Sequence, residues 1–479
     1  MATISKEFPN IQISHLDSRA HSYRYKQAQF HRLYDILTKS SSTLKLAIQA
    51  DSVLTSMEAD FEFASTLLEL RTHYDSLDLE KDLRAARKVE LGLDNIERTR
   101  PVGIVYIIPS KSSLAFSVLS ALGAAIAAGA CAIVELPQTL TQTSAALRKI
   151  LTDSLDYDTF ALSSSRPTSD FTRKCLLVNQ TEEVINPLEW AQVLSSPSVA
   201  GTVAVVDRTA NLSEATQAVA EATFGFSGGS AYAPQLVLVN EFVAEPFLSE
   251  LVSKFARDLG TTYQKPNGHM SRLQEAPKES SKFDNLKTVV SGSKGDIVEI
   301  LDRCTPFFER KTPERTILVH RISSLDDALN VLKSQQLAAI FLFAGLPQAN
   351  YLSRFINADL CTINHIPMEL LVGPVAPRHP SLPSTSSPRY ASAMFTMPAP
   401  QYLPKPHSAQ SLTNLKDQEL LRKLRDTAMQ PLLPIVRKSG HQLNFFGQAI
   451  FLGFGMAVTS IIGVSIGGLY LVLRQYRVR

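Results

Sequence analysis

The chain has 479 residues, of which 44% are hydrophobic and 19% are charged, and its formal net charge at pH 7 is +3. This length is sufficient for two or three domains with hydrophobic cores, and the composition excludes a disordered chain. The near-neutral charge and the lack of a long Lys/Arg run give no indication of a nucleic-acid partner.

The first hundred residues are predicted to be mostly helical. In residues 28–46 the apolar positions recur every three or four residues, which indicates an amphipathic helix. A second helix is predicted after Ser56, and residues 78–91 form a charged third helix. We assign residues 1–100 to N-terminal helices and a bridging segment.

The pattern then changes to alternating strands and helices. Residues 102–108 (VGIVYII) and 131–134 are continuous apolar runs, which are typical of strands buried on both faces of a parallel sheet. Residues 114–129 and 139–155 are predicted to be the helices that follow them. This alternation predicts a doubly wound α/β domain over residues 101–200.

The alternation recurs in a second, catalytic-type α/β unit, which we assign to residues 201–372. Its predicted strands and helices are, in chain order, residues 203–206, 213–223, 235–239, 247–259, 316–320, 324–334 and 338–343. Residues 373–440 are first rich in Pro and Ser and then charged, which indicates a loop-like return segment followed by a helix. The predicted fold class is therefore α/β, with two doubly wound domains.

The C-terminal part of the chain predicts one transmembrane helix over residues 445–473. Residues 442–473 contain no charged side chain, and about 20 apolar residues span a bilayer core. Basic residues flank the segment: Arg437, Lys438, Arg474, Arg477 and Arg479. Because only a short tail follows, we expect the helix to insert after synthesis and to leave the body in the cytosol. A buried core helix is the alternative interpretation.

Several segments, in chain order, resemble the aldehyde dehydrogenase superfamily, in particular its class 3 or fatty-aldehyde type. Residues 101–108 (PVGIVYII) and 118–135 (VLSALGAAIAAGACAIVE) resemble its first cofactor-binding unit. Residues 203–212 (VAVVDRTANL) and 224–234 (FGFSGGSAYAP) resemble the strand before the catalytic loop and the loop itself. The resemblance covers nearly the whole chain. It implies NAD or NADP as cofactor, a homodimer, and a C-terminal anchor of the kind found in the membrane-bound members.

By this resemblance, the position of the family's catalytic cysteine falls on Ala231, which has no nucleophile. The family's mechanism needs a thiolate that attacks the aldehyde carbonyl and forms a thiohemiacetal. Ser230 and Tyr232 flank this position with hydroxyls, but no base is visible beside them, so we expect both to pack or to form hydrogen bonds. The family's oxyanion asparagine falls near Ser112, whose hydroxyl is a shorter donor.

The positions that would bind the cofactor also differ. By the resemblance, Pro109 and Ser110 fall at the cofactor-binding turn, and the lysine that meets the cofactor's ribose or phosphate falls on Glu135. A carboxylate at that position should repel a polyanionic ligand, and a chain without its cofactor is therefore one expectation. The family's general-base glutamate falls near Pro197, in a stretch that has no carboxylate.

The cysteines offer no clear replacement for the missing thiol. Cys131 and Cys361 lie in strand-like apolar runs, where we expect small buried side chains. Cys304, beside a charged loop, is the cysteine that we expect to be exposed. No CxxC or other close pair is formed by these residues and Cys175, so we expect no structural metal and no disulfide framework, and we infer a reducing compartment.

Two functions follow from these residues, and a third stays open, in which the fold carries a different reaction or binds a lipophilic ligand without turnover. The first is a membrane-anchored aldehyde dehydrogenase-like protein without thiol-dependent activity, which acts as a non-catalytic or accessory homologue and pairs with itself or with an active homologue. The alternative is an NAD(P)-dependent oxidoreductase that oxidises a lipophilic aldehyde to the acid, in fatty-aldehyde or apolar-metabolite pathways. The resemblance favours the endoplasmic reticulum as the membrane and leaves mitochondria and peroxisomes open.

Overall fold

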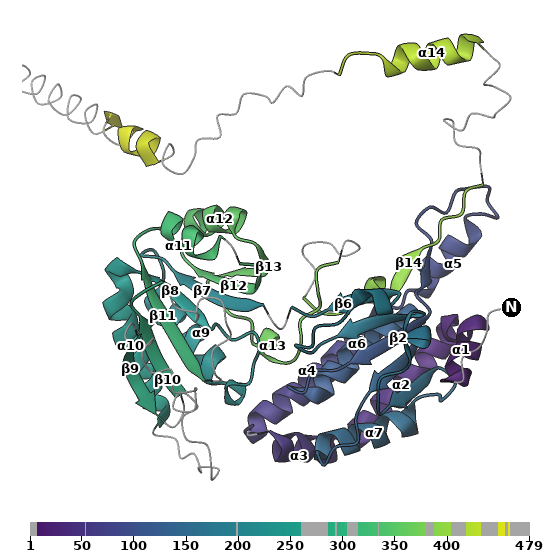
Figure 1. The fold of residues 1–479 in the computed structure, drawn as a ribbon, viewed down its shortest axis with the longest axis horizontal. Coiled ribbons are helices and arrows are strands. Elements are labelled where there is room, and N and C mark those ends of the chain that lie inside the picture. The colour runs from purple at the N-terminus through teal and green to yellow at the C-terminus, as the bar shows by residue number, and fades with distance from the viewer. Residues whose placement is uncertain are drawn as a thin grey trace, which may run out of the picture. The chain divides into compact units, whose positions relative to one another are not determined.

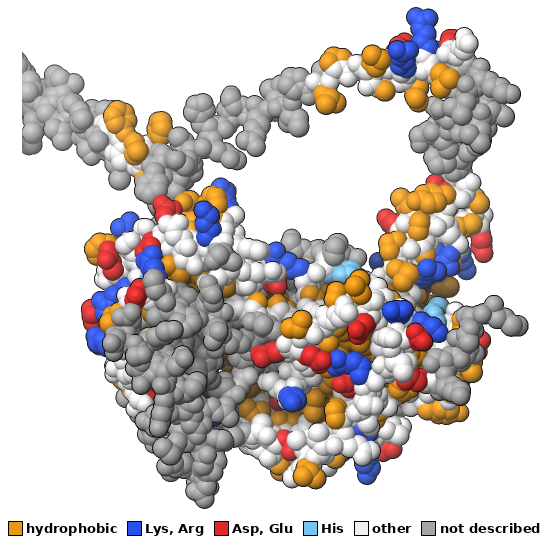
Figure 2. All heavy atoms as spheres, in the orientation of Figure 1, with side chains coloured by type: hydrophobic (Ala, Val, Ile, Leu, Met, Phe, Trp, Pro, Cys, Tyr) orange, Lys and Arg blue, Asp and Glu red, His pale blue; other side chains and the backbone are white. Residues whose placement is uncertain are grey.

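The computed structural model describes residues 7–52, 54–197, 200–259, 286–292, 295–303, 315–333, 335–379, 388–403, 418–432, 449–455 and 458–459. The chain divides into two units, Met1–Pro404 and Lys405–Arg479, and each is described by itself. The first unit contains two α/β lobes (Figure 1). On the face of that unit drawn in Figure 2, acidic and basic side chains are interspersed, consistent with the small net charge.

The first lobe is built on a five-stranded parallel sheet. Its strands are β2 (Ile104–Ile108), β3 (Cys131–Glu135), β4 (Phe160–Ser163), β5 (Cys175–Asn179) and β6 (Gln192–Ser195), in the order β4-β3-β2-β5-β6. From β2 the chain runs outward through β3 and β4, and it then returns to the other side of β2 to form β5 and β6. The strand order therefore reverses between β2 and β5, at the centre of the sheet.

Helices cover one face of this sheet and bury its apolar side chains. They are α2 (Tyr23–Lys39), α3 (Ser41–Asp51), α4 (Ser56–Asp75), α6 (Leu114–Ala128) and α7 (Gln142–Ser154). Helix α6 is Ala-rich and buried along almost its whole length, as expected for a helix that is hydrophobic all round. It ends before Gly129, whose φ of +87° is the left-handed conformation that commonly follows a helix.

The opposite face of the first sheet is covered less extensively. Ile11 of α1 (Pro9–Leu16) and the indole of Trp190 pack there against Tyr106 of β2. Two further helices are short: α5 (Leu79–Arg87) contributes no buried residue, and α8 (Ser169–Thr172) precedes β5. This lobe therefore has one thick helical layer and one thin layer.

The second lobe is built on a seven-stranded sheet. Its strands are β7 (Gly201–Val206), β8 (Leu236–Asn240), β9 (Leu286–Gly292), β10 (Gly295–Ile300), β11 (Thr316–Ile322), β12 (Leu337–Phe343) and β13 (Ala358–Ile363), in the order β13-β12-β7-β8-β11-β10-β9. Among these strands β9 alone is antiparallel to its neighbour. Helices α9 (Leu212–Phe224) and α10 (Glu241–Leu259) pack on one face, and α11 (Leu325–Leu332) and α12 (Leu346–Phe355) on the other (Figure 1).

After the second lobe the chain returns to the first. Leu371 of α13 (Met368–Leu371) joins Phe116 of α6 and Phe226 in an apolar cluster that links the two lobes. Strand β14 (Thr396–Pro398) then pairs antiparallel with β1 (Thr99–Pro101), and Phe395 is buried in the core of the first lobe. The lobes are thus joined by side-chain packing as well as by the chain itself.

Most predicted elements lie where the sequence places them, with two corrections. The helix predicted over residues 28–46 is divided at Ser40, whose backbone is not helical, so that α2 and α3 are separate. Helix α10 begins at Glu241, six residues before the predicted start, although it contains Pro246. A proline in the second turn removes only one N–H from the helix, and the buried Phe247 and Leu251 anchor the rest.

The predicted transmembrane segment lies mostly outside the described residues. In the C-terminal unit the structure describes α14 (Gln418–Ala428), within the predicted juxtamembrane helix, and helical residues 449–455 and 458–459. Within the described parts of the chain, no helix has the length and hydropathy needed to cross a membrane. The anchor therefore stays a prediction from the sequence.

Candidate functional site

A cleft of about 490 Å³ lies at the carboxyl end of the first sheet. Ile108 at the end of β2, Glu135 at the end of β3 and Thr181 just after β5 all line it. Ligands of open α/β sheets bind at this edge, next to the point where the strand order reverses. The volume is within the range of small-molecule sites. The cleft is therefore the first candidate for a binding site.

The lining of the cleft combines apolar walls with acidic groups. Apolar surface comes from Ile48, Ile108, Leu114 and Leu136, and from Pro109 and Pro137. Four carboxyl groups also line the cleft: Asp51, Glu62, Glu135 and Glu183. Lys111 is the one cationic side chain in this lining. The cleft is consequently acidic, in contrast to the near-neutral charge of the whole chain.

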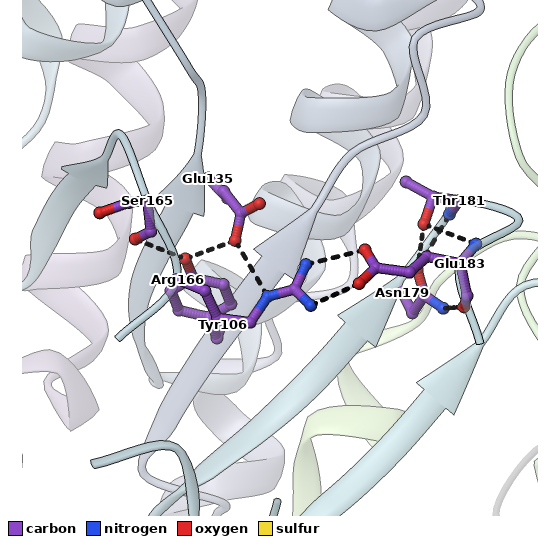
Figure 3. Close-up of polar contacts among 7 residues, drawn as sticks. All are labelled: Tyr106, Glu135, Ser165, Arg166, Asn179, Thr181 and Glu183. Carbon is purple, nitrogen blue, oxygen red and sulfur yellow. Dashed lines mark hydrogen bonds and ion pairs between the residues drawn. The ribbon is translucent and has the colours of Figure 1, made fainter. Parts of the chain in front are cut away.

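Glu135 is held in an ordered polar network (Figure 3). Its carboxylate accepts a hydrogen bond of 2.7 Å from the Tyr106 hydroxyl and lies 3.6 Å from Nε of Arg166. The same guanidinium donates two hydrogen bonds, of 2.7 and 2.9 Å, to the carboxylate of Glu183. These bonds lower the pKa of Glu183 and raise that of Arg166, while burial raises the pKa of the Tyr106 hydroxyl. The charge of Arg166 is thus shared between two carboxylates.

The loop after β5 is fixed by the side chain of Asn179 (Figure 3). Its carbonyl accepts hydrogen bonds from the backbone N–H and the hydroxyl of Thr181, at 3.0 and 2.8 Å, and its amide donates to the carbonyl of Glu183 at 3.0 Å. An Asn side chain that bonds two residues ahead imitates a backbone turn. The turn presents Glu183 to Arg166 and closes one side of the cleft.

Glu62 on α4 is the most deeply buried carboxyl group of the cleft. Its side chain is only 2% exposed, and its Oε1 has no hydrogen-bond partner among the described residues. Burial raises its pKa to about 7, against a smaller opposite effect of a hydrogen bond from the backbone of Phe116. Asp51, by contrast, accepts hydrogen bonds from the backbone N–H groups of Gln142 and Thr143 at the start of α7, at 2.9 and 2.6 Å.

The residues that the sequence places at the catalytic position lie where the two lobes meet. Ser112 is exposed, and its hydroxyl donates to the carbonyl of Gly229 at 3.2 Å, two residues before Ala231. The structure therefore brings the Ser112 turn next to the Ala231 loop. Ala231 is partly buried and packs against the core of the second lobe. Its methyl group offers no nucleophile at this junction.

The hydroxyls beside Ala231 are used to hold the loop. Tyr232 is 2% exposed, and its hydroxyl lies 2.9 Å from the Ser196 hydroxyl and accepts a hydrogen bond of 2.9 Å from the Val375 N–H. Ser230 accepts a hydrogen bond of 3.3 Å from the Tyr232 N–H. Burial raises the pKa of the Tyr232 hydroxyl, which disfavours the phenolate. Neither hydroxyl has a base beside it in these contacts.

The positions assigned to a cofactor-binding turn lie beside the cleft. Pro109 lines the cleft directly. The Ser110 hydroxyl accepts a hydrogen bond of 3.3 Å from the Ser112 N–H, which tightens the turn after β2. Pro109, Glu135 and Ser112 are thus close to one edge of the lobe, whereas Tyr232 belongs to the core of the other lobe.

None of the described cysteines lies in the loop of Ala231. Cys131 and Cys175 are buried, and burial raises the pKa of each thiol to about 12. Cys361 is exposed, which corrects the expectation that it is buried; it lies on β13, an edge strand of the second sheet. Its pKa is also raised by desolvation. Cys304 lies outside the described residues.

The sheet register places Cys361 three strands away from the start of β8, the strand that follows the Ala231 loop. Cys361 aligns with Ile340, Ile340 with Val203, and Val203 with Leu236, the first residue of β8. Three strand spacings of about 4.8 Å separate Cys361 from Leu236 by about 14 Å. Exposure alone therefore does not make Cys361 a nucleophile for this site.

The chain has an α/β, aldehyde dehydrogenase-like fold. It is similar to Staphylococcus aureus AldH in a substrate-bound state, with a TM-score of 0.65 and 16% identity over 89% of this chain and 100% of that one. It is also similar to a salicylaldehyde dehydrogenase from Pseudomonas putida G7 complexed with salicylaldehyde, with a TM-score of 0.63 and 13% identity over 86% and 92% of the two chains.

A third similar structure was determined with a cofactor. This is the glyceraldehyde-3-phosphate dehydrogenase GapN from Methanocaldococcus jannaschii complexed with NADP, with a TM-score of 0.54 and 13% identity over 75% of this chain and 84% of that one. By sequence, the chain matches no family model and no curated protein. At these identities the comparisons establish the fold, α/β and aldehyde dehydrogenase-like.

The residues of the cleft do not fit the dinucleotide that this fold implies. A pyrophosphate is stabilised by cations or by helix N-termini that point at it. Here Glu135 lies at the end of β3, and Arg166, the cation nearest to it, is shared with Glu183. The chain between β5 and β6 contains only the 3₁₀ turn Pro187–Glu189 and no α-helix. The cleft is present, but its charge opposes a polyanion.

Sequence reasoning missed the groups that determine this charge. It singled out Glu135 but not Glu62, Arg166 or Glu183, which lie in three different segments. Their proximity depends on the packing of α4 and on the loops after β4 and β5, which no local pattern encodes. The one signal available was that Glu62 interrupts an apolar stretch of α4.

Glu62→Gln should stabilise the protein above pH 7. Since the folded-state pKa is about 7 and the unfolded value about 4.5, the native state holds a proton that the unfolded state has lost. Stability should therefore fall as the pH rises from 4.5 through 7, by roughly 3 kcal/mol. The variant should melt at a higher temperature than the wild type at pH 8 and at a similar one at pH 5.

Thermal unfolding of the full chain in detergent measures this effect. Glu97→Gln is the matched control, because the Glu97 side chain is 81% exposed. This variant should show the same difference in melting temperature between pH 5 and pH 8 as the wild type. If the melting temperature of the Glu62→Gln variant depends on pH as that of the wild type does, burial does not raise the pKa of the Glu62 carboxyl group.

Proposed function

We propose that this chain is a membrane-anchored protein with an aldehyde dehydrogenase fold that lacks thiol-dependent dehydrogenase activity and serves as a binding or accessory subunit. The observation that carries the proposal is Ala231, in a loop whose Gly229 carbonyl contacts Ser112 of the other lobe. That junction corresponds to the position of the catalytic thiol in the class 3 type that the sequence resembles. In this proposal, the contact between the Ser112 turn and the Ala231 loop is kept, and the thiol nucleophile is absent.

The chemistry of aldehyde oxidation supports this proposal. The reaction needs a thiolate to form the covalent intermediate, an oxyanion donor and an acceptor for the hydride. Ala231 cannot supply the first group. The acidic cleft does not favour the third, because Glu62, Glu135 and Glu183 all line it. The thiolate and the hydride acceptor are thus both disfavoured, for independent reasons. One substitution would therefore not be sufficient to give dehydrogenase activity.

The binding role is supported by what the chain retains. The cleft at the carboxyl end of the first sheet still has the size of a small-molecule site. Its walls are held by the hydrogen bonds of Asn179 and by the ion pairs of Arg166. As partners we propose a second copy of the chain or an active relative with the same fold, which the accessory subunit would keep at the membrane.

The membrane tether rests on the uncharged residues 442–473. That segment is long enough to cross a bilayer and is flanked by basic side chains. Upstream of it, α14 carries Arg422, Lys423 and Arg425. We propose a single-pass protein with its body in the cytosol, and the endoplasmic reticulum as the membrane.

The second candidate function is NAD(P)-dependent oxidation of a lipophilic aldehyde. It is favoured by the persistence of the cleft and by the exposed Ser112 hydroxyl at the junction of the lobes. A membrane anchor would then bring the protein to a substrate that dissolves in lipid. This candidate requires a nucleophile other than a thiol at position 231.

Purified full chain is expected to form no NADH or NADPH from long-chain aldehydes. Ala231→Cys alone should not restore the reaction, because the cleft still opposes the dinucleotide. Loss of a nucleophile lowers kcat by about a millionfold. Because the cleft also opposes the dinucleotide, the rate should equal that without protein. Absorbance at the reduced nicotinamide band measures it, with Ala233→Cys as the matched control. Saturable turnover by the wild type would establish the second candidate instead.

Residues 449–479 are expected to be required for membrane association. The full chain should pellet with membranes after carbonate extraction, and a chain without these residues should stay in the supernatant. The double substitution Ile462→Lys and Ile466→Lys should also leave the chain in the supernatant, because inserting one lysine at the centre of a membrane span costs about 2.5–3.5 kcal/mol. Gln475→Lys, beyond the apolar segment, is the matched control. A truncated chain that still pellets would contradict the single-anchor proposal.

A further inference from the structure

We infer that the cleft at the carboxyl end of the first sheet binds a small organic cation, a protonated amine with an apolar body. The inference rests on the proposed function, because the organic cation would occupy the cleft that a dinucleotide would otherwise fill. It assigns the cleft a ligand whose charge is the opposite of that of NAD or NADP.

The balance of charge around the cleft favours a cation. Asp51, Glu62, Glu135 and Glu183 contribute four carboxyl groups to the lining, and Lys111 contributes one cation. Arg166 lies behind this lining and is shared by Glu135 and Glu183. Four acidic groups against two cations leave two negative charges when all are ionised. A cleft with walls of one sign attracts ligands of the other sign.

Glu62 provides the observation that is independent of this count. It lines the cleft, its side chain is 2% exposed, and its Oε1 has no hydrogen-bond partner among the described residues. The backbone of Phe116 bonds the carboxyl group, but a buried carboxylate oxygen that lacks a partner is unfavourable, and proteins normally pair such an atom. An ammonium group in the cleft would donate a hydrogen bond to this oxygen and neutralise its charge.

The other carboxylates are bound by Tyr106, Arg166 or two backbone N–H groups, whereas Glu62 has only the backbone hydrogen bond of Phe116, so its Oε1 is the anchor. Asp51 accepts two backbone hydrogen bonds at the start of α7. Glu135 accepts one from Tyr106, and Glu183 accepts two from Arg166. These three groups supply a negative field, whereas Glu62 supplies an unused acceptor.

The remaining lining favours an organic cation. Among the described residues, no group of three or more His, Cys, Asp or Glu side chains is placed to hold a metal ion. The walls instead include the apolar side chains of Ile48, Ile108, Leu114 and Leu136. Hydroxyls of Thr143 and Ser144 lie on the same walls and can accept from an ammonium. An amine on an apolar body matches both kinds of surface.

Three ligands of similar size and different charge test this inference: benzylamine, benzyl alcohol and benzoate. Each is titrated by calorimetry at pH 7.5 into the full chain in detergent. The wild type should bind benzylamine at least tenfold more tightly than benzyl alcohol, and benzoate should give no saturable heat. Glu62→Gln should weaken benzylamine binding at least tenfold, whereas Glu97→Gln, an exposed residue outside the cleft, should leave it unchanged.

Two results would overturn the inference. One is equal affinity for benzylamine and benzyl alcohol in the wild type, and the other is unchanged benzylamine binding in a Glu62→Gln variant that melts cooperatively. Formation of NADPH from aldehyde, measured on the same preparation, reports separately on the proposed function. Without turnover and without amine binding, the inference alone is wrong; with turnover, the proposed function is wrong.

Discussion

The ion pairs of Arg166 determine the character of the first lobe's ligand cleft. One guanidinium lies between Glu135 at the end of β3 and Glu183 in the turn after β5, at the edge where the strand order reverses (Figure 3). Because Arg166 is engaged with two carboxylates, it does not offset the negative charge of the remaining acidic lining. A polyanionic cofactor would need to displace these contacts or face that charge. The ion pairs of Arg166 therefore hold the ends of two strands together and also disfavour the dinucleotide that the fold implies.

The second lobe carries the loop that the sequence resemblance assigns to a catalytic thiol. The contact between Ser112 and Gly229 joins the Ala231 loop to the first lobe, and the Ala231 side chain itself carries no nucleophile. Packing explains how the fold persists. Tyr232 and Phe226 are buried at this junction and depend on shape and hydrogen bonding, not on a thiol. The course of this loop therefore depends on its hydrophobic neighbours and on the hydrogen bonds of Tyr232.

The sequence predicts only part of the fold, because strands β4, β5, β6, β9 and β10 are not among the predicted elements, and it predicts the charge of the cleft only in part. Buried strands such as β2 and the Ala-rich helix α6 have patterns that need no tertiary information. The edge strand β9 was missed because its exposed residues give no continuous apolar run, and Cys361 was expected to be buried because an edge strand cannot be recognised locally. The reversed charge at Glu135 was visible in the sequence. The isolation of Glu62 and the pairing of Arg166 depend on contacts between distant segments, which a single sequence does not reveal.

Direct titration of NADPH into the full chain, followed by the fluorescence of its nicotinamide, tests the central claim that this aldehyde dehydrogenase fold no longer accepts its cofactor. We predict no saturable change up to millimolar NADPH, because the cleft carries excess negative charge and its one shared guanidinium is already engaged. Saturable binding with a micromolar dissociation constant, corresponding to about 8 kcal/mol, would contradict the account. It would mean that the cleft rearranges to bind a dinucleotide despite Glu135.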